Sequence, residues 1–143
     1  MVDKSKMIPK QLENNQFRFI KVRDNKAPLE DDWTGKNNYL WYESEIVNYI
    51  EKNKRYGVLC GCGGLVVIDF DNKEVQDEIM PKLPETFTVK SAGKGLFHLY
   101  YITEEAESFK ILNLNKETLA DIQGKGKQVI GAGTIMPMAR VMR

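Results

Sequence analysis

The stretch Gly64-Leu-Val-Val-Ile-Asp-Phe-Asp71 decides the fold of this chain. Apolar residues at consecutive positions, Val66 to Ile68, are typical of a strand that is covered on both faces. The preceding Gly61-Cys-Gly-Gly64 predicts a tight connection to another strand at residues 56–60. These two strands are expected to form the centre of the protein.

A first strand and two helices are predicted on either side of this centre. Residues 17–22 combine β-prone side chains with partial apolar alternation, which predicts a strand. Ser44 is expected to cap a helix over residues 44–54, whose apolar stripe should lie against a sheet. A shorter helix over residues 73–80 should end there, because the next residue is a proline.

Two hairpins complete the predicted pattern. The first joins residues 86–90 to 96–102 across a Gly-Lys-Gly turn, and the second joins 119–123 to 128–130 across a similar one. The sequence contains no internal repeat and no obvious linker. We therefore predict one α+β domain with a largely antiparallel sheet.

The composition is that of an ordinary globular domain. The 143 residues are 42% hydrophobic and 29% charged, and no apolar run is long enough to span a bilayer. The N-terminus does not resemble a secretory signal, so we expect a cytoplasmic protein without a membrane role. Cys60 and Cys62 lie two apart on an extended segment and are expected to be small thiols, with neither a disulfide nor a zinc site.

Asp69 and Asp71 form the clearest chemical motif, with two carboxylates at the end of an apolar strand. Residues two apart on a strand share a face and lie roughly 6.6 Å apart along the backbone. Such a pair can lean over one Mg²⁺ or Mn²⁺ ion, the hard cations that prefer oxygen ligands. The alternative is that the aspartates only end the strand, with one of them capping the next helix.

His98 lies in a predicted strand just after the glycine-rich segment Ser91-Ala-Gly-Lys-Gly95. The hydroxyl of Ser91, the backbone amides and the ammonium of Lys94 are suited to holding a triphosphate, although the spacing is not that of a Walker A loop. A single histidine in a strand is also commonly structural, and that alternative stays open.

Asp121 precedes Gly124-Lys-Gly-Lys127 and is a candidate third metal ligand, with Lys125 as a candidate nucleotide contact. The alternative is an ordinary hairpin turn with solvated lysines. The formal net charge is only +1, but residues 110–143 hold six basic and two acidic residues, a local excess of 6 − 2 = +4. This last quarter of the chain could meet phosphate.

Five segments of the chain follow one another in a recognisable order and spacing. They are Gly57-Val-Leu-Cys-Gly61, Gly64-Leu-Val-Val-Ile-Asp-Phe-Asp71, Pro84-Glu-Thr-Phe-Thr-Val89, Ser91-Ala-Gly-Lys-Gly-Leu-Phe-His-Leu-Tyr-Tyr101 and Ala120-Asp-Ile-Gln-Gly-Lys-Gly126. Together they resemble the bifunctional DNA primase-polymerase family of the archaeo-eukaryotic primase superfamily. The resemblance runs from about Phe17 to about Pro137.

The resemblance implies an RRM-like catalytic core and a role for each motif. Asp69 and Asp71 match the family's paired metal ligands, Asp121 matches its third catalytic carboxylate, and His98 matches its phosphate-binding histidine. Lys94 would be an auxiliary phosphate contact. The family often has a histidine where this chain has Met136, followed by further catalytic-domain sequence, whereas this chain stops at Arg143. We therefore expect residues 1–143 to be a single catalytic domain that is truncated at its C-terminal side relative to the family.

The function implied by this resemblance is metal-dependent, template-directed nucleotidyl transfer in DNA replication. Its expected partners are nucleoside triphosphates, a single-stranded or primed DNA template, and a helicase or another replication subunit. One alternative is a non-catalytic or incomplete module of the same fold that binds nucleotide or single-stranded nucleic acid. The other is a metal-dependent nuclease that uses the same carboxylates.

Overall fold

The computed structural model describes residues 7–90 and 95–134 of the chain. The chain divides into two compact units. One consists of Met1–Leu59 together with Gln128–Arg143, and the other of Cys60–Lys127. In both, all strand pairs are antiparallel, which agrees with the predicted α+β class.

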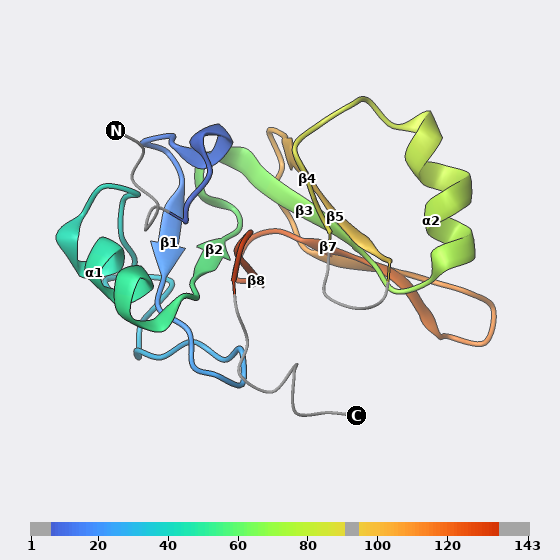
Figure 1. The fold of residues 1–143 in the computed structure, drawn as a ribbon. Helices are drawn as coiled ribbons and strands as arrows, with labels where there is room; N and C mark the ends of the chain where they lie inside the picture. Colours follow the sequence, from blue (N-terminus) through green and yellow to red (C-terminus); the bar gives the residue numbers. More distant parts are fainter. Residues whose placement is uncertain (1–6, 91–94, 135–143) are drawn as a thin grey trace. The chain divides into compact units, whose positions relative to one another are not determined.

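The first unit is built on a three-stranded sheet (Figure 1). Its strands, in the order β1-β2-β8, are Arg18–Ile20, Gly57–Leu59 and Gln128–Ile130. A short 3-10 helix, η1, spans Lys10–Leu12, and helix α1 spans Ser44–Asn53. The core of this unit contains fully buried side chains from the strands, from α1 and from the segment before β2, namely Phe19, Ile20, Ile46, Tyr56 and Val58.

Helix α1 begins where the sequence predicts it, but Ser44 does not cap it. The N-cap position is Glu43, and no side chain there bonds to the first turn. Instead, Glu43 Oε2 accepts a hydrogen bond from the backbone N–H of Leu40 at 2.6 Å. The helix ends at Asn53, and the C-cap residue Lys54 adopts a left-handed conformation (φ 58°).

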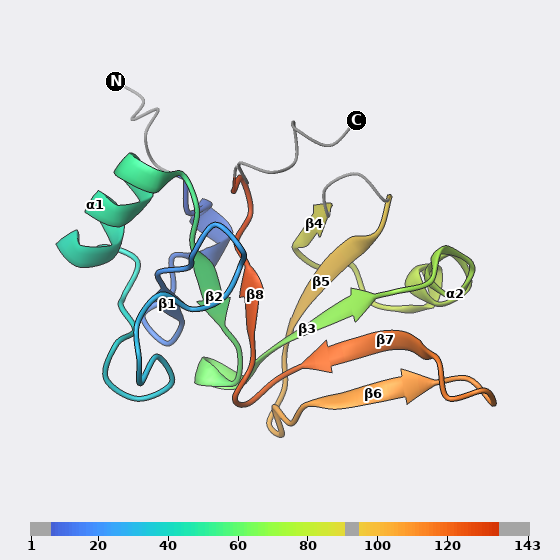
Figure 2. The same ribbon diagram turned by 90° about the horizontal axis from the view of Figure 1, so that it is seen from below.

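The second unit contains a five-stranded sheet in the order β4-β5-β3-β7-β6 (Figure 2). These strands are Thr88–Lys90, Phe97–Ile102, Leu65–Phe70, Thr118–Gln123 and Phe109–Leu112. Helix α2 spans Lys73–Ile79 and is followed by the 3-10 turn η3 at Met80–Lys82, so the predicted stop near Pro81 is confirmed. The predicted β4–β5 hairpin is also confirmed.

The glycine-rich connection before β3 does not make a hairpin with β2, because β2 and β3 belong to different sheets. A 3-10 turn, η2, spans Cys62–Gly64. Gly61, Gly63 and Gly64 all have positive φ, and a Cβ at Gly64 would lie 2.4 Å from the carbonyl oxygen of Thr103. Glycine is required here by backbone conformation and by close approach, rather than by a two-residue turn.

The predicted second hairpin is wrong. Strand β7 pairs with β3 and β6, whereas β8 pairs with β2 in the other sheet. The sequence prediction missed β6, which forms the actual hairpin with β7. All four β6 residues are exposed, so burial imposes no alternating pattern that could be recognised.

Helix α2 covers one face of the five-stranded sheet. Val75 and Ile79 of the helix pack against the buried cluster of Phe70, Leu99 and Ala120. Asn72, not an aspartate, caps the helix, because its Oδ1 accepts the N–H of Val75 at 3.0 Å. The two aspartates do lie at the end of β3, but the alternative that one of them caps the helix is wrong.

Candidate active site

A row of polar side chains crosses the five-stranded sheet. The strand register places Asp69 of β3 directly opposite His98 of β5 on one side and Asp121 of β7 on the other. Asp121 in turn lies opposite Lys110 of β6. Directly opposed residues share a face, and alternation puts this row on the face away from Phe70, Leu99 and Ala120. The site residues therefore lie on the side that α2 does not cover.

Asp69 and His98 are in contact. The distance from His98 Nε2 to Asp69 Oδ1 is 3.2 Å, and the two side chains are 16% and 29% exposed. The other ring nitrogen, Nδ1, is buried and has no hydrogen-bond partner among the residues that the structure describes. A buried polar atom without a partner is costly, so His98 has an unused hydrogen-bonding position that a ligand could fill.

Asp121 is paired with a residue that the sequence analysis gave no role. Lys110 Nζ donates a hydrogen bond to Asp121 Oδ1 at 2.8 Å. The hydrogen bond and the charge of Asp121 raise the pKa of Lys110, and the more distant charges of Asp71 and Asp69 contribute in the same direction. All three carboxylates of the predicted metal site therefore contribute to the raised pKa of Lys110.

Asp71 follows the end of β3 but continues its ladder. The backbone N–H of Asp71 donates to the carbonyl of Leu119 at 2.9 Å, next to β7. Its side chain is exposed. Because Asp71 lies in a bend beyond the last residue of β3, the shared face of Asp69 and Asp71 stays a prediction.

The carboxylates do not form a ready-made metal cage. Within residues 7–90 and 95–134, no three His, Cys, Asp or Glu side chains lie close enough together to hold an ion. The backbone nevertheless places two aspartates directly opposite each other, an arrangement that like charges disfavour without compensation. Here His98 and Lys110 contact the outer sides of the pair. Asp69 and Asp121 are the residues of this row whose oxygen atoms could hold a divalent cation.

The structure does not bring every predicted residue to this row. Lys125 lies beyond the end of β7, close to Gly61 and therefore near the start of β3, whereas Asp69 is near the end of that strand. Ser91 and Lys94 lie outside the described residues. The nucleotide-binding roles of these three residues stay predictions.

Lys110 and Gln76 were missed by the sequence analysis. Lys110 was counted only as one of the basic residues near the C-terminus, because β6 was not recognised. Gln76 was hidden within a short helix, although a glutamine among apolar residues on the inner side of a helix would have been a signal. Its contacts are described below.

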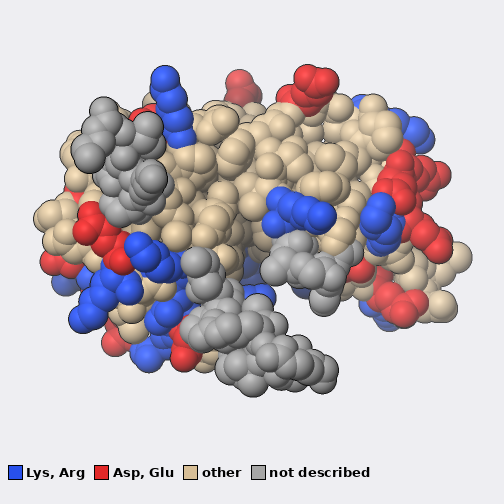
Figure 3. All heavy atoms as spheres, in the orientation of Figure 1, with Lys and Arg blue, Asp and Glu red and all other residues tan. Residues whose placement is uncertain are grey.

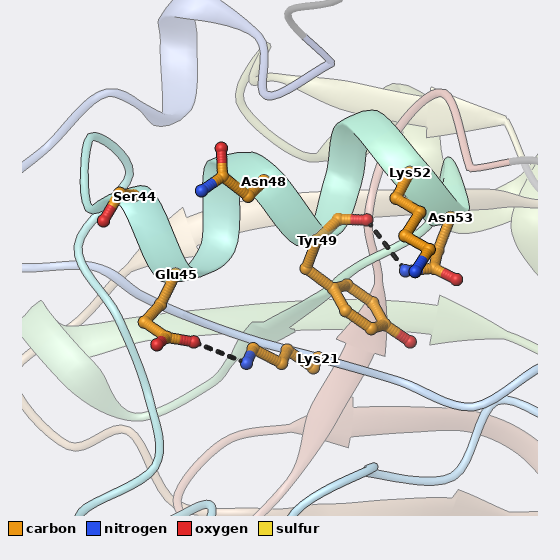
Figure 4. A pocket seen from close by; sticks show the side chains of 7 residues that line it. All are labelled: Lys21, Ser44, Glu45, Asn48, Tyr49, Lys52 and Asn53. Atoms are coloured by element: carbon orange, nitrogen blue, oxygen red, sulfur yellow. Dashed lines mark hydrogen bonds and ion pairs between the residues drawn. The ribbon is translucent and has the colours of Figure 1, made fainter.

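A hollow of about 410 Å³ lies in the other unit, beside α1 (Figure 4). It is lined by Lys21, Ser44, Glu45, Asn48, Tyr49, Lys52 and Asn53. Lys21 Nζ lies 2.7 Å from Glu45 Oε2 and faces the rings of Tyr39 and Tyr49. The charge of Lys21 is already compensated, and the hollow contains no carboxylate pair, so the row on the sheet remains the candidate active site.

The side of the molecule drawn in Figure 3 has charged side chains of both signs. Figure 3 shows basic and acidic groups interspersed, with acidic groups gathered over α2, where Glu74, Asp77 and Glu78 are exposed. Among the residues described, no helix has the length and apolar character needed to cross a membrane.

Comparison with known proteins identifies the family of the chain. The family model described as bifunctional DNA primase/polymerase, N-terminal, matches residues 10–143. This match includes Asp69, His98, Asp121 and both sheets. A search of curated proteins found no match. The chain therefore belongs to the Prim-Pol family of bifunctional DNA primase/polymerase N-terminal domains.

Proposed function

We propose that this chain is a metal-dependent nucleotidyltransferase that adds nucleotides to a 3′-hydroxyl or to an initiating nucleotide under the direction of a DNA template. The observation that carries the proposal is the cross-strand row of His98, Asp69 and Asp121 on the sheet face opposite α2. Membership of the Prim-Pol family supports the same reaction class.

In this proposal, the five-stranded sheet and α2 correspond to the RRM-like core that the family resemblance implies. In RRM-like sheets, the face that is not covered by helices is the one that meets the nucleic-acid ligand. The acidic row lies on that face here, and its position supports the correspondence.

Asp69, Asp71 and Asp121 would hold Mg²⁺ or Mn²⁺. When bound, such cations lower the pKa of the attacking hydroxyl and neutralise charge on the pyrophosphate leaving group. Asp121, which binds Lys110 in this structure, would hold the ion in its place, and this would free the Lys110 ammonium at the edge of the site. The freed Lys110 would then attract the triphosphate through its positive charge.

His98 would bind the phosphates of the incoming nucleotide. Its imidazole is held beside Asp69 and has an unused nitrogen, Nδ1. A protonated imidazole donates from both nitrogens, so it can keep the carboxylate contact and donate a second hydrogen bond to an anion. Ser91, Lys94 and Lys125 are proposed as further phosphate contacts. We also propose a cytoplasmic location, and a helicase or another replication subunit as a partner.

Incorporation of labelled nucleotides tests this function directly. The full chain would be incubated with Mg²⁺ or Mn²⁺ and either ribonucleotides or deoxyribonucleotides, on a primed template and on an unprimed single strand. Extension or new dinucleotide product that is absent in Asp69→Asn, but present in the control Glu117→Gln, supports the proposal. No product under any of these conditions contradicts it.

A second function is favoured by one observation. Asp69 and Asp121 are already engaged by His98 and Lys110, and no metal cage is formed by the described residues. These contacts also suit a non-catalytic module that binds nucleotide or single-stranded DNA. Such a module would bind triphosphate without incorporating it. A nuclease would instead shorten the labelled strand without adding nucleotides.

A further inference from the structure

Gln76 is the buried polar side chain of α2. It is 1% exposed, while every other residue of this helix is at least partly exposed. Among the described residues, only Asn38 is another buried side chain of polar or charged type. A buried amide destabilises a fold unless both its ends are hydrogen-bonded, so the partners of Gln76 reveal its role.

Both ends of the Gln76 amide bind backbone at the start of β5. Nε2 donates to the carbonyl oxygen of Gly95 at 3.1 Å, and Oε1 accepts the N–H of Phe97 at 2.8 Å. The side chain therefore binds a short backbone segment in the way that a neighbouring strand would. Glutamine suits this position because it supplies one donor and one acceptor together.

The residue after this bonded segment is His98. Phe97 is the first residue of β5, and its pairing with Lys90 is the outermost pair between β4 and β5. Gln76 therefore binds the backbone of β5 at the point where its pairing with β4 ends. The next residue is His98, whose imidazole contacts Asp69. A shift in the backbone of Phe97 would therefore move His98 relative to Asp69.

We propose that Gln76 is a positioning residue that holds His98 in place for binding phosphate. This inference rests on the proposed function for the phosphate ligand, but the effect on His98 itself does not depend on any ligand. The competing explanation is that Gln76 only helps to attach α2 to the sheet. Val75 and Ile79 also attach the helix, through apolar contacts with the cluster around Phe70.

Two substitutions separate these explanations. Gln76→Met keeps a similar volume but removes both hydrogen bonds to Gly95 and Phe97. Val75→Ala is the matched control, because it weakens the packing of α2 while leaving both of those bonds in place. A third variant, Gln76→Glu, keeps an acceptor for Phe97 but puts an oxygen against the Gly95 carbonyl.

The first measurements need no ligand. The chain contains a single histidine, so its imidazole NMR signals report on His98 alone. We expect Gln76→Met to shift or broaden these signals and to accelerate exchange of the Phe97 amide by roughly tenfold relative to Val75→Ala. Gln76→Glu should perturb the imidazole but protect the Phe97 amide better than methionine does.

The last measurement uses a nucleoside triphosphate with Mg²⁺ and, separately, the nucleoside. We expect Gln76→Met to weaken triphosphate binding by about tenfold and nucleoside binding by much less. If the unmodified chain binds no triphosphate, the proposed function fails, and the imidazole and amide signals alone decide the role of Gln76. Identical imidazole signals in Gln76→Met and Val75→Ala would overturn the inference.

Discussion

Asp69 and Asp121 lie directly opposite each other on neighbouring strands, so two carboxylates face the same side of the sheet. His98 contacts one of them and Lys110 the other, at 3.2 Å and 2.8 Å. The row therefore has two carboxylates side by side in its middle, with hydrogen-bonding partners, His98 and Lys110, at its two ends that compensate them. A divalent cation would take over this compensation from the side chains.

Asp121→Asn should remove most of the stabilisation that divalent cations give. A cation that binds only the folded chain raises the melting temperature by mass action, and loss of one of three carboxylates weakens that binding. Thermal unfolding with and without millimolar Mn²⁺ measures the effect. Glu117→Gln is the control, because Glu117 belongs to the same hairpin but binds Asn113. Equal thermal shifts in the two variants would remove Asp121 from the site.

Lys110→Met should increase affinity for the metal. Lys110 competes with a cation for Asp121, and removing an exposed partner of this kind changes affinity by up to about fivefold. The metal-free variant should also melt at a lower temperature in low salt, because the carboxylates then lose their nearest positive charge. Lys116→Met in the same hairpin should show neither change. Calorimetric titration with Mn²⁺ provides the measurement, and weaker metal binding by Lys110→Met would contradict the competition.

Much of the second unit could be predicted from the sequence. Apolar runs and alternation identified β3, β4 and β5, and Pro81 marked the end of α2. The positions of Asp69 on β3 and His98 on β5 followed from those strands. These elements are specified by residues that are close together in the sequence, which is why local patterns were sufficient.

The pairing of distant strands could not be predicted in the same way. β7 and β8 are separated by four residues that resemble a hairpin turn, yet each strand joins a different sheet. The contact of Lys110 with Asp121 depends on β6, whose exposed side chains leave no pattern. The bonds of Gln76 to Gly95 and Phe97 span about twenty residues and depend on how α2 packs. Such features are determined by tertiary structure.

The Cys60 thiol should be inert near neutral pH. Burial raises the pKa of Cys60 from 9.0 to about 12, and the neighbouring Cys62 contributes in the same direction. Since the thiolate is the reactive form, a thiol reagent at pH 8 should modify the partly buried Cys62 first. Mass spectrometry of the modified chain identifies the site. Faster modification of Cys60 in the folded protein would contradict the prediction.

The same group makes stability depend on alkaline pH. The unfolded thiol loses its proton near pH 9, while the folded one keeps it until about pH 12. The contribution of Cys60 is therefore complete below pH 9 and is lost as the pH rises toward 12, at up to about 1.4 kcal/mol per pH unit. Cys60→Ala should reduce the slope of unfolding free energy against pH in this range. An unchanged slope would show that Cys60 does not contribute.

His98→Ala should weaken the binding of a nucleoside triphosphate more than that of the nucleoside. The imidazole is held by Asp69 and has one nitrogen without a described partner, so it is proposed to face phosphate rather than base. Loss of a hydrogen bond to a charged group lowers affinity by about tenfold or more. His98→Gln retains a donor and should recover part of that loss. Calorimetric titration of all three proteins with both ligands gives the comparison, and equal losses for triphosphate and nucleoside would return His98 to a structural role beside Asp69.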